Sequence, residues 1–164
     1  MRMKNAAAAL GLVTALCGAT SAANTWKDYA YWPQHFAISF PAPPTTIREN
    51  GSFLAHDEKG TADLTAVAAC GLAPGLTPEQ IVSNGIANSR MNGTIRDLAD
   101  VAAGPVEGKA MVVDRVDGTT VRQRIFSRKG CLYVIFGTIV KGHDEKRVTL
   151  FLDSFKLLSP LEGG

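Results

Sequence analysis

The fold class of this chain follows from residues 106–158, which read VEGKAMVVDRVDGTTVRQRIFSRKGCLYVIFGTIVKGHDEKRVTLFLDSFKLL. The segment contains three apolar-rich runs, at residues 106–116, 119–127 and 131–140. The pairs Asp117-Gly118 and Lys129-Gly130 join these runs. Both pairs are typical of hairpin turns, because glycine accepts the positive φ that a tight turn demands. The segment therefore predicts three consecutive antiparallel strands.

A helix is expected to close this segment. After a charged opening at residues 143–147, the apolar residues Val148, Phe151, Leu152 and Phe155 recur at the i, i+3, i+4 and i+7 spacing of one helix face. Over the whole chain the order is strands, helix, strands, helix. This order predicts an α+β domain with a mostly antiparallel β-sheet of about six to seven strands flanked by helices.

Further strands are predicted before and between the helices. Residues 36–40 alternate apolar and small side chains, and the prolines of residues 41–44 end that strand because proline cannot donate to a ladder. Asn50-Gly51 predicts another hairpin. The full set of these strands is 36–40, 45–49, 52–56, 61–70 and 94–102.

The start of the first helix is marked by a capping box. Thr77 is placed as the N-cap, Pro78 occupies the first helical position, and Gln80 is placed to complete the box. Ile81, Val82, Ile86 and Met91 form the expected apolar stripe, and Asn92-Gly93 the expected C-terminal cap.

Residues 1–23 are expected to be a signal peptide. Arg2 and Lys4 provide a positive start, an apolar run too short to span a bilayer follows, and residues 21–23 are small, as at a cleavage site. The chain is thus expected to be periplasmic or secreted and cut after Ala23. A lipoprotein anchored through Cys17 is the main alternative, although Leu16 precedes this cysteine where a lipobox has a small residue.

The charge balance disfavours two classes of partner. Arg2 and Lys4 are the charged residues of the signal peptide, so the net charge of +2 falls to zero in the mature chain. Binding to nucleic acid or to anionic lipid draws on an excess of Lys and Arg, so neither is expected. The remaining length suits one soluble domain at residues 36–158, preceded by an aromatic-rich segment at 24–35 and followed by a flexible tail at 159–164.

Two cysteines, Cys70 and Cys131, remain after cleavage. In an oxidising compartment an even number favours a disulfide, which would stabilise the fold by roughly 4 kcal/mol in the chain-entropy model. Two separately buried thiols are the alternative. A redox-catalytic role is not expected, because the sequence has no Cys-x-x-Cys motif and no evident partner to lower a thiol pKa.

Four segments of the chain resemble the PsbP-like α/β/α sandwich proteins. They are Phe36-Ala37-Ile38-Ser39-Phe40-Pro41, the helix near the middle, Gly130-Cys131-Leu132-Tyr133-Val134-Ile135, and Phe151-Leu152-Asp153-Ser154-Phe155. This family includes lumenal photosystem assembly subunits and bacterial envelope proteins. The resemblance implies a binding or assembly role without a shared catalytic signature, so it transfers no functional residue. The partner-binding segments of the plant members have no counterpart here.

An aromatic cluster precedes the first strand of the domain. It consists of Trp26, Tyr29, Tyr31 and Trp32. Trp and Tyr dominate the anchors of protein interfaces, so this cluster is a candidate site for an envelope protein partner. The alternative is that these rings pack on the domain's own core.

A second candidate site comes from the expected strand register. If Asp117-Gly118 is a two-residue turn, Met111 faces Arg124, and one sheet face collects Arg122, Arg124, Phe126, Met111, Tyr133 and Ile135. The opposite face, with Val121, Ile125, Leu132, Val134 and Phe136, is then the core. Arg122 and Arg124, with Tyr133 beside them, are candidates to bind a small anionic ligand. The alternative is that both arginines cover the sheet and pair with acids such as Glu107 and Asp114.

The sequence shows no motif for catalysis or metal binding. His35, His56 and His143 lie far apart and in no ligand spacing, and Gly-x-Ser-x-Gly and phosphate-loop patterns are absent. We therefore expect no metal, no cofactor and no catalytic residue. The leading hypothesis is an exported, non-catalytic binding or accessory protein, and the alternative is a small periplasmic enzyme whose site is assembled across the sheet.

Overall fold

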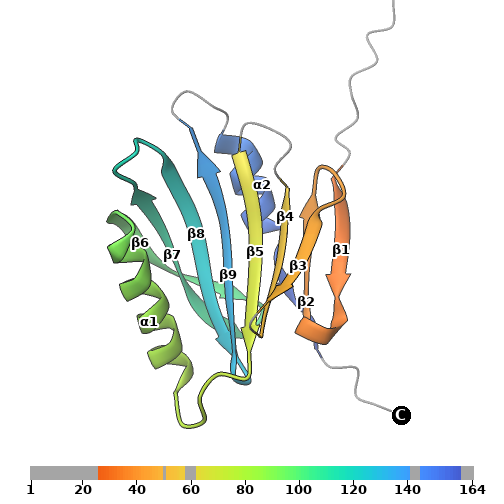
Figure 1. Ribbon diagram of the computed structural model, residues 1–164. Helices are drawn as coiled ribbons and strands as arrows, with labels where there is room; N and C mark the ends of the chain where they lie inside the picture. Colours follow the sequence, from red (N-terminus) through yellow and green to blue (C-terminus); the bar gives the residue numbers. More distant parts are fainter. Residues whose placement is uncertain (1–25, 50, 58–61, 141–144, 160–164) are drawn as a thin grey trace, which may run out of the picture.

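The computed structural model describes residues 26–49, 51–57, 62–140 and 145–159. These residues form a seven-stranded antiparallel sheet, a three-stranded sheet and two α-helices that lie on opposite sides of the larger sheet (Figure 1). The structure is the α+β sandwich that the sequence predicts. The expected signal peptide, residues 58–61, His143 and the end of the tail lie outside the described residues.

The large sheet has the strand order β3-β4-β5-β9-β8-β7-β6. Its strands are β3 (Thr45–Glu49), β4 (Ser52–Asp57), β5 (Ala62–Cys70), β6 (Thr94–Ala103), β7 (Val106–Asp114), β8 (Thr120–Arg128) and β9 (Cys131–Ile139). The three strands predicted from residues 106–140 thus form consecutive hairpins. Strand β9 lies in the middle of the sheet, because it pairs with β8 on one side and with β5 on the other.

The small sheet has the order β1-β2-β10. Its strands are β1 (Lys27–Tyr31), β2 (Phe36–Phe40) and β10 (Lys156–Leu157), and the 3-10 helix η1 (Trp32–Gln34) joins the first two. The sequence predicts β2, and its alternation places Phe36, Ile38 and Phe40 in the core. The aromatic N-terminal segment belongs to the domain, because β1 pairs with β2 along its whole length.

The two central hairpins differ in their turns. At Lys129-Gly130 the turn has two residues, since Arg128 pairs with Cys131, as expected. The loop at Asp117-Gly118 is longer: Arg115 donates its N–H to the Thr119 carbonyl at 2.9 Å, so three residues lie between the closing pair. The predicted register is therefore wrong by one residue. Val113 pairs with Val121 and Met111 with Gln123, which moves Met111 to the sheet face opposite Arg122 and Arg124.

Helix α1 (Pro78–Met91) begins with the predicted capping box. The Thr77 Oγ1 accepts a hydrogen bond from the Gln80 N–H, and the Gln80 side chain accepts one from the Thr77 N–H at 2.8 Å. Ile81 and Val82 are buried, as predicted. Met91 was expected in the same stripe, but its side chain is 79% exposed, because the helical repeat places it on the side of α1 opposite buried Val82.

Helix α2 (Glu145–Asp153) packs on the other side of the large sheet. Val148, Phe151 and Leu152 are buried, and so is Phe155 directly after the helix, which confirms the predicted apolar face. Together with the small sheet, α2 covers the face that carries Phe126, Tyr133 and Ile135; we call this the α2 face. The opposite face, beneath α1, is the α1 face.

The main core lies on the α2 face. Its members include Phe36, Phe40, Phe126, Phe151 and Phe155, and the rings of Phe126 and Phe155 are stacked with centroids 5.3 Å apart. The sequence predicts a core on the face of Ile125 and Val134, and it did not predict this larger core on the α2 face. The α1 face holds a smaller cluster formed by Val82, Met111, Val113, Val121 and Ile125.

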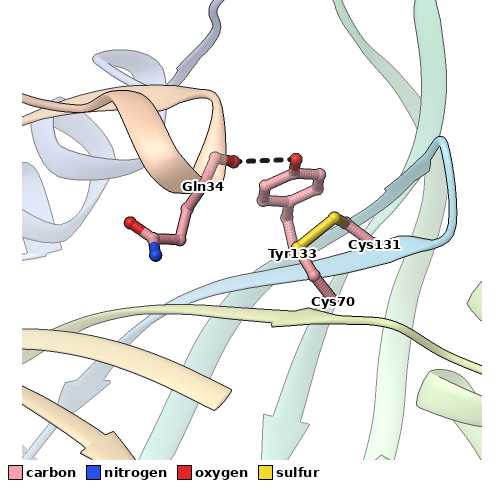
Figure 2. The surroundings of a disulfide bond; sticks show 4 residues. All are labelled: Gln34, Cys70, Cys131 and Tyr133. Atoms are coloured by element: carbon pink, nitrogen blue, oxygen red, sulfur yellow. Dashed lines mark hydrogen bonds between the residues drawn. A yellow bond between two sulfur atoms is a disulfide. The ribbon is translucent and has the colours of Figure 1, made fainter. Parts of the chain in front are cut away.

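A disulfide joins Cys70 and Cys131 across β5 and β9. The two residues are directly opposite each other in the register, with Cα atoms 4.0 Å apart. Figure 2 shows the Tyr133 ring beside this disulfide, with its hydroxyl directed at η1. That hydroxyl donates a hydrogen bond to the Gln34 carbonyl at 2.9 Å. The disulfide therefore lies where the small sheet joins the large one.

Candidate functional site

A groove of about 380 Å³ lies between α1 and the large sheet. The sheet provides its floor, α1 one of its walls, and the loop before α1 one of its ends. The residues that line it are Leu72, Leu76, Ile81, Asn84, Gly85, Asn88, Ser89, Asn92, Val113, Arg115, Val121, Gln123, Ile125, Leu132, Val134 and Phe136. Its volume lies within the range typical of small-molecule sites.

The floor of the groove is apolar because of strand alternation. Leu132, Val134 and Phe136 are alternate residues of β9 and therefore lie on the α1 face. Val134 is directly opposite Ile125 of β8. The three β9 side chains are only half-buried, because α1 packs over β6, β7 and β8 and does not cover β9 (Figure 1). A strip of apolar surface thus remains open beside the helix.

The helix wall of the groove is polar and uncharged. Asn84, Asn88 and Asn92 recur every four residues, so they lie along one side of α1. The Asn92 side chain donates to the Asn88 carbonyl at 3.0 Å. Within the described part of the chain, the amides of Asn84 and Asn88 make no side-chain hydrogen bond, so both can donate to and accept from a bound molecule.

A hydrogen bond between Gln123 and Ser89 joins α1 to the floor of the groove. Gln123 of β8 is buried, and its Nε2 donates to the Ser89 Oγ at 2.5 Å. The Ser89 hydroxyl in turn donates to the Gly85 carbonyl at 3.0 Å. This chain of bonds ties α1 to the sheet at a fixed distance, and it satisfies the one buried amide of the floor.

The lining chemistry favours binding over bond-making. Of the lining residues that the structure describes, none is Asp, Glu, His, Lys or Cys, and Arg115 is the single charged one. Such a surface can bury an apolar molecule and hydrogen-bond to it along one side.

The two candidate arginines lie on the opposite face, where both bind α2. Arg122 donates to Glu145 at 2.5 Å, near the start of the helix. At the other end, Arg124 donates to the Leu152 carbonyl at 2.9 Å and forms an ion pair with Asp153. These partners differ from the expected Glu107 and Asp114; Asp114 binds Arg96 instead, at 2.7 Å. Arg122 and Arg124 therefore fasten α2 to the sheet.

Tyr133 does not lie beside an open anion site either. Its side chain is buried in the main core, and burial raises the pKa of its hydroxyl although the nearby positive charge of Arg128 opposes that shift. The hydroxyl donates to Gln34, so it holds η1 in place. Tyr133 shares the α2 face with Arg122 and Arg124, as predicted, but its partner is backbone.

The aromatic cluster lies mostly against the core. Trp26, Tyr29 and Tyr31 are partly buried and pack on the main core, and the rings of Tyr29 and Phe40 meet edge to face at 6.0 Å. Trp32 is the most open of the four, with 48% of its surface exposed. The cluster therefore serves chiefly to cover the small sheet, and Trp32 is the ring available to a partner.

The two histidines that the structure describes, His35 and His56, lie on different elements. His35 ends η1 with a positive φ of 56°, and His56 lies on β4, opposite Thr45 and Thr65. Among the described residues, no group of three His, Cys, Asp or Glu side chains is placed to hold a metal ion. No helix in the described part of the chain is both long enough and apolar enough to cross a bilayer.

Sequence reasoning missed the groove. Its one sequence signal is the four-residue spacing of Asn84, Asn88 and Asn92 on a helix with a predicted cap. The floor was assigned to the closed core, because its alternation is the same as that of a fully covered strand. Only the position of α1 over β6, β7 and β8 shows that β9 is left partly open.

Comparison with known proteins gives similarity in structure alone. No protein-family model and no curated protein matches the chain. The solution structure of cyanobacterial PsbP (CyanoP) from Synechocystis sp. PCC 6803 aligns with a TM-score of 0.56 at 9% identity, over 86% of this chain and 96% of that one.

A crystal structure from Bacteroides thetaiotaomicron VPI-5482 aligns with a TM-score of 0.55 at 14% identity and covers 85% of this chain. The chain spans about half of that protein, since 51% of its length is covered. At these identities the alignments establish architecture and leave the site chemistry to the residues of this chain. The fold of this chain is PsbP-like.

Proposed function

We propose that this chain is an exported, non-catalytic binding protein of the bacterial envelope, which holds a small, elongated and mostly apolar molecule in the groove beside α1. The observation that carries the proposal is the pairing of an open apolar floor with an uncharged amide wall. An accessory role agrees with this arrangement, because Arg122, Arg124 and Tyr133 of the α2 face all bind other parts of the fold.

The energetics favour an apolar ligand. Burying apolar surface contributes about 25 cal/mol per Å², so covering the half-buried side chains of Leu132, Val134 and Phe136 drives binding. The amides of Asn84 and Asn88 then select molecules that carry uncharged polar groups along one edge. A charged ligand would lose its hydration in the groove, where Arg115 is the one ionic partner.

Two features support export. The first 23 residues have the charge and hydropathy pattern of a signal peptide. The disulfide between Cys70 and Cys131 fits an oxidising compartment. Expression of the full chain in a bacterial host, followed by fractionation and mass measurement, tests this part: a periplasmic product that starts at Asn24 is expected, and an uncut cytoplasmic product would refute it.

The groove is tested with the uncharged fluorescent probe phenylnaphthylamine. We expect its fluorescence to rise when it is titrated with the folded protein. Val134→Arg places a charge on the apolar floor and should reduce the affinity for the probe by at least tenfold.

The matched control is Ile47→Arg. Ile47 lies in the same cross-strand row, which runs Ile47–Leu54–Val67–Val134, but it is on the edge strand β3, is 45% exposed and does not line the groove. Ile47→Arg should bind the probe like the unchanged protein. Equal binding by both variants, or equal loss in both, would contradict a site in the groove.

A further inference from the structure

The Cys70–Cys131 disulfide lies in a cleft of its own, away from the α1 groove. The cleft measures about 280 Å³, and its lining consists of Pro33, His35, Cys70, Arg128, Lys129, Cys131 and Tyr133. Two of these side chains, Arg128 and Lys129, are permanently cationic near neutral pH, and none of the described lining residues is acidic. The approach to the disulfide through this cleft is therefore electropositive, whereas a neighbouring hollow that Cys70 also lines contains both Arg48 and Glu49.

The register explains why the charges gather there. Cys70 is opposite Cys131, and Cys131 is opposite Arg128, so these three residues form one row across β5, β9 and β8. Residues directly opposite each other in a ladder project from the same face, which brings the Arg128 side chain beside the disulfide. Arg128 Nη1 donates to the Leu158 carbonyl at 3.0 Å, and this bond holds the side chain at the cleft.

The two cysteine residues differ in their exposure to solvent. Cys131 is buried at 9% exposure, whereas Cys70 is partly exposed at the end of β5. Lys129 is exposed in the turn that follows Arg128, where it has a positive φ of 49°. An incoming thiolate thus meets Lys129 and Arg128 on its way to Cys70. Nearby cations stabilise thiolates, both the attacking one and the one that leaves.

We propose that the Cys70–Cys131 disulfide is a redox site that undergoes thiol–disulfide exchange with small anionic thiols. In the first step a thiolate attacks Cys70 Sγ, a mixed disulfide forms, and the bond between the two cysteines breaks. Cys131 leaves as a thiolate beside Arg128 and takes a proton from water. A second thiol molecule then attacks the mixed disulfide and leaves Cys70 as a thiol. Two thiols are oxidised to one small disulfide, and their two electrons reduce the protein disulfide.

The test measures how the rate of reduction depends on the charge of the thiol. The folded full chain is treated with mercaptopropionate, mercaptoethanol or cysteamine, which are anionic, neutral and cationic, and free cysteines are counted by mass after alkylation. Rate constants are expressed per thiolate. We expect mercaptopropionate to react roughly tenfold faster than cysteamine, because the two cations that line the cleft attract one reagent and repel the other.

Two variants show whether Arg128 and Lys129 cause this preference. Lys129→Asn keeps the hydrogen bond from Arg128 to Leu158, and asparagine tolerates a positive φ. It should lower the anionic-to-cationic rate ratio about threefold, and Arg128→Gln should lower it at least as much. Lys27→Gln, which removes an exposed cation at the far end of β1, should leave the ratio unchanged.

A substitution that only altered access to the disulfide would change the rates with all three thiols by a similar factor. The ratio of the mercaptopropionate rate to the cysteamine rate therefore separates an electrostatic effect from a purely structural one. The proposal is overturned if the disulfide resists all three thiols until the protein unfolds, or if Lys129→Asn retains the ratio of the unchanged protein. These readouts do not involve the α1 groove, so they are independent of the proposed ligand binding.

Discussion

The two faces of the large sheet are covered to very different extents. On the α2 face, a helix and a second sheet enclose a core in which Phe36, Phe40 and Ile135 have at most 1% of their surface exposed. On the α1 face, a single helix lies over one half of the sheet, and Leu132 and Val134 remain half-buried. Cohesion is thus concentrated on one side of this domain, which leaves the other side free to bind.

Two glycines show how closely each helix approaches the sheet. A Cβ at Gly137 of β9 would lie 2.6 Å from the Val148 Cγ2 of α2, so this glycine permits direct contact between helix and strand. A Cβ at Gly85 of α1 would lie 3.1 Å from the Ile125 Cδ1, which is the far end of a flexible side chain. The contact of α2 is therefore tighter than that of α1.

The largest effect is expected from truncating the aromatic core. Phe151 is fully buried, and its ring lies 5.0 Å from that of Phe40. Phe151→Ala should lower the free energy of unfolding by about 3–5 kcal/mol, because it removes buried apolar surface and leaves a cavity. Val134→Ala on the α1 face should cost no more than about 1 kcal/mol. Denaturant unfolding measures both, and equal losses would contradict the contrast between the faces.

The next prediction compares the stability effects of alanine substitutions at Gly137 and Gly85. Gly137→Ala should destabilise the protein by about 1–3 kcal/mol, because buried Val148 has to move. Gly85→Ala should have the opposite sign and stabilise by about 0.5 kcal/mol, since alanine raises helix propensity by about 1 kcal/mol and the contact with Ile125 offsets part of that gain. Thermal unfolding of both variants checks the signs. A destabilised Gly85→Ala would mean that α1 packs as tightly as α2.

A smaller effect is expected at the arginines that hold α2. Arg124→Ala removes a hydrogen bond to the Leu152 carbonyl and the ion pair with Asp153, and should cost about 1–2 kcal/mol. Arg122→Ala should cost about 0.5 kcal/mol, because the Arg122 side chain is more exposed than that of Arg124, 37% against 25%, and it has no recorded hydrogen bond to a helix carbonyl. Urea unfolding at low and high salt measures both, and only the Arg122 effect should shrink markedly with salt. A larger loss in Arg122→Ala than in Arg124→Ala would mean that the start of α2 is held to the sheet more strongly than its end.

The elements of this fold were predictable because their signals are local. Thr77, Pro78 and Gln80 specify a helix start through bonds within one turn. Lys129-Gly130 specifies a hairpin through backbone conformation alone, since both residues have positive φ. Neither signal depends on distant parts of the chain. The predicted strands therefore agree with the observed ones to within a few residues.

The register and the burial of each face were not predictable in this way. Asp117-Gly118 suits both a two-residue and a three-residue loop; here the Asp117 carboxylate accepts hydrogen bonds from the Thr119 N–H and hydroxyl, at 2.9 and 2.7 Å, within the longer loop. One residue of difference moves Met111 to the other face. Strand β9 has large apolar side chains on both faces, so its local pattern cannot say which face receives the second sheet. The partners of Arg122 and Arg124 depend on the same long-range choice.

The effect that should be smallest at neutral pH concerns Tyr31, where the small sheet meets the α2 face. Its ring packs 4.8 Å from that of Phe53, and its buried hydroxyl has no hydrogen-bond partner among the described residues. Burial, and to a lesser extent Tyr29, raises the pKa of Tyr31 to about 12 from an ordinary 10.0. In the unfolded chain the hydroxyl ionises at lower pH than in the folded one, so the free energy of unfolding should fall as the pH rises from about 10 to about 12.

Tyr31→Phe should remove this part of the alkaline loss and leave stability at pH 7 equal or slightly higher, because the hydroxyl it deletes is buried without a partner. Tyr133→Phe is the matched control, since it deletes a hydroxyl that donates to Gln34, and should cost about 1 kcal/mol already at pH 7. Denaturant unfolding across this pH range measures both variants. If Tyr31→Phe destabilised the protein at neutral pH as much as Tyr133→Phe, the Tyr31 hydroxyl would have a partner, and the seam between the sheets would be more polar than its aromatic rings suggest.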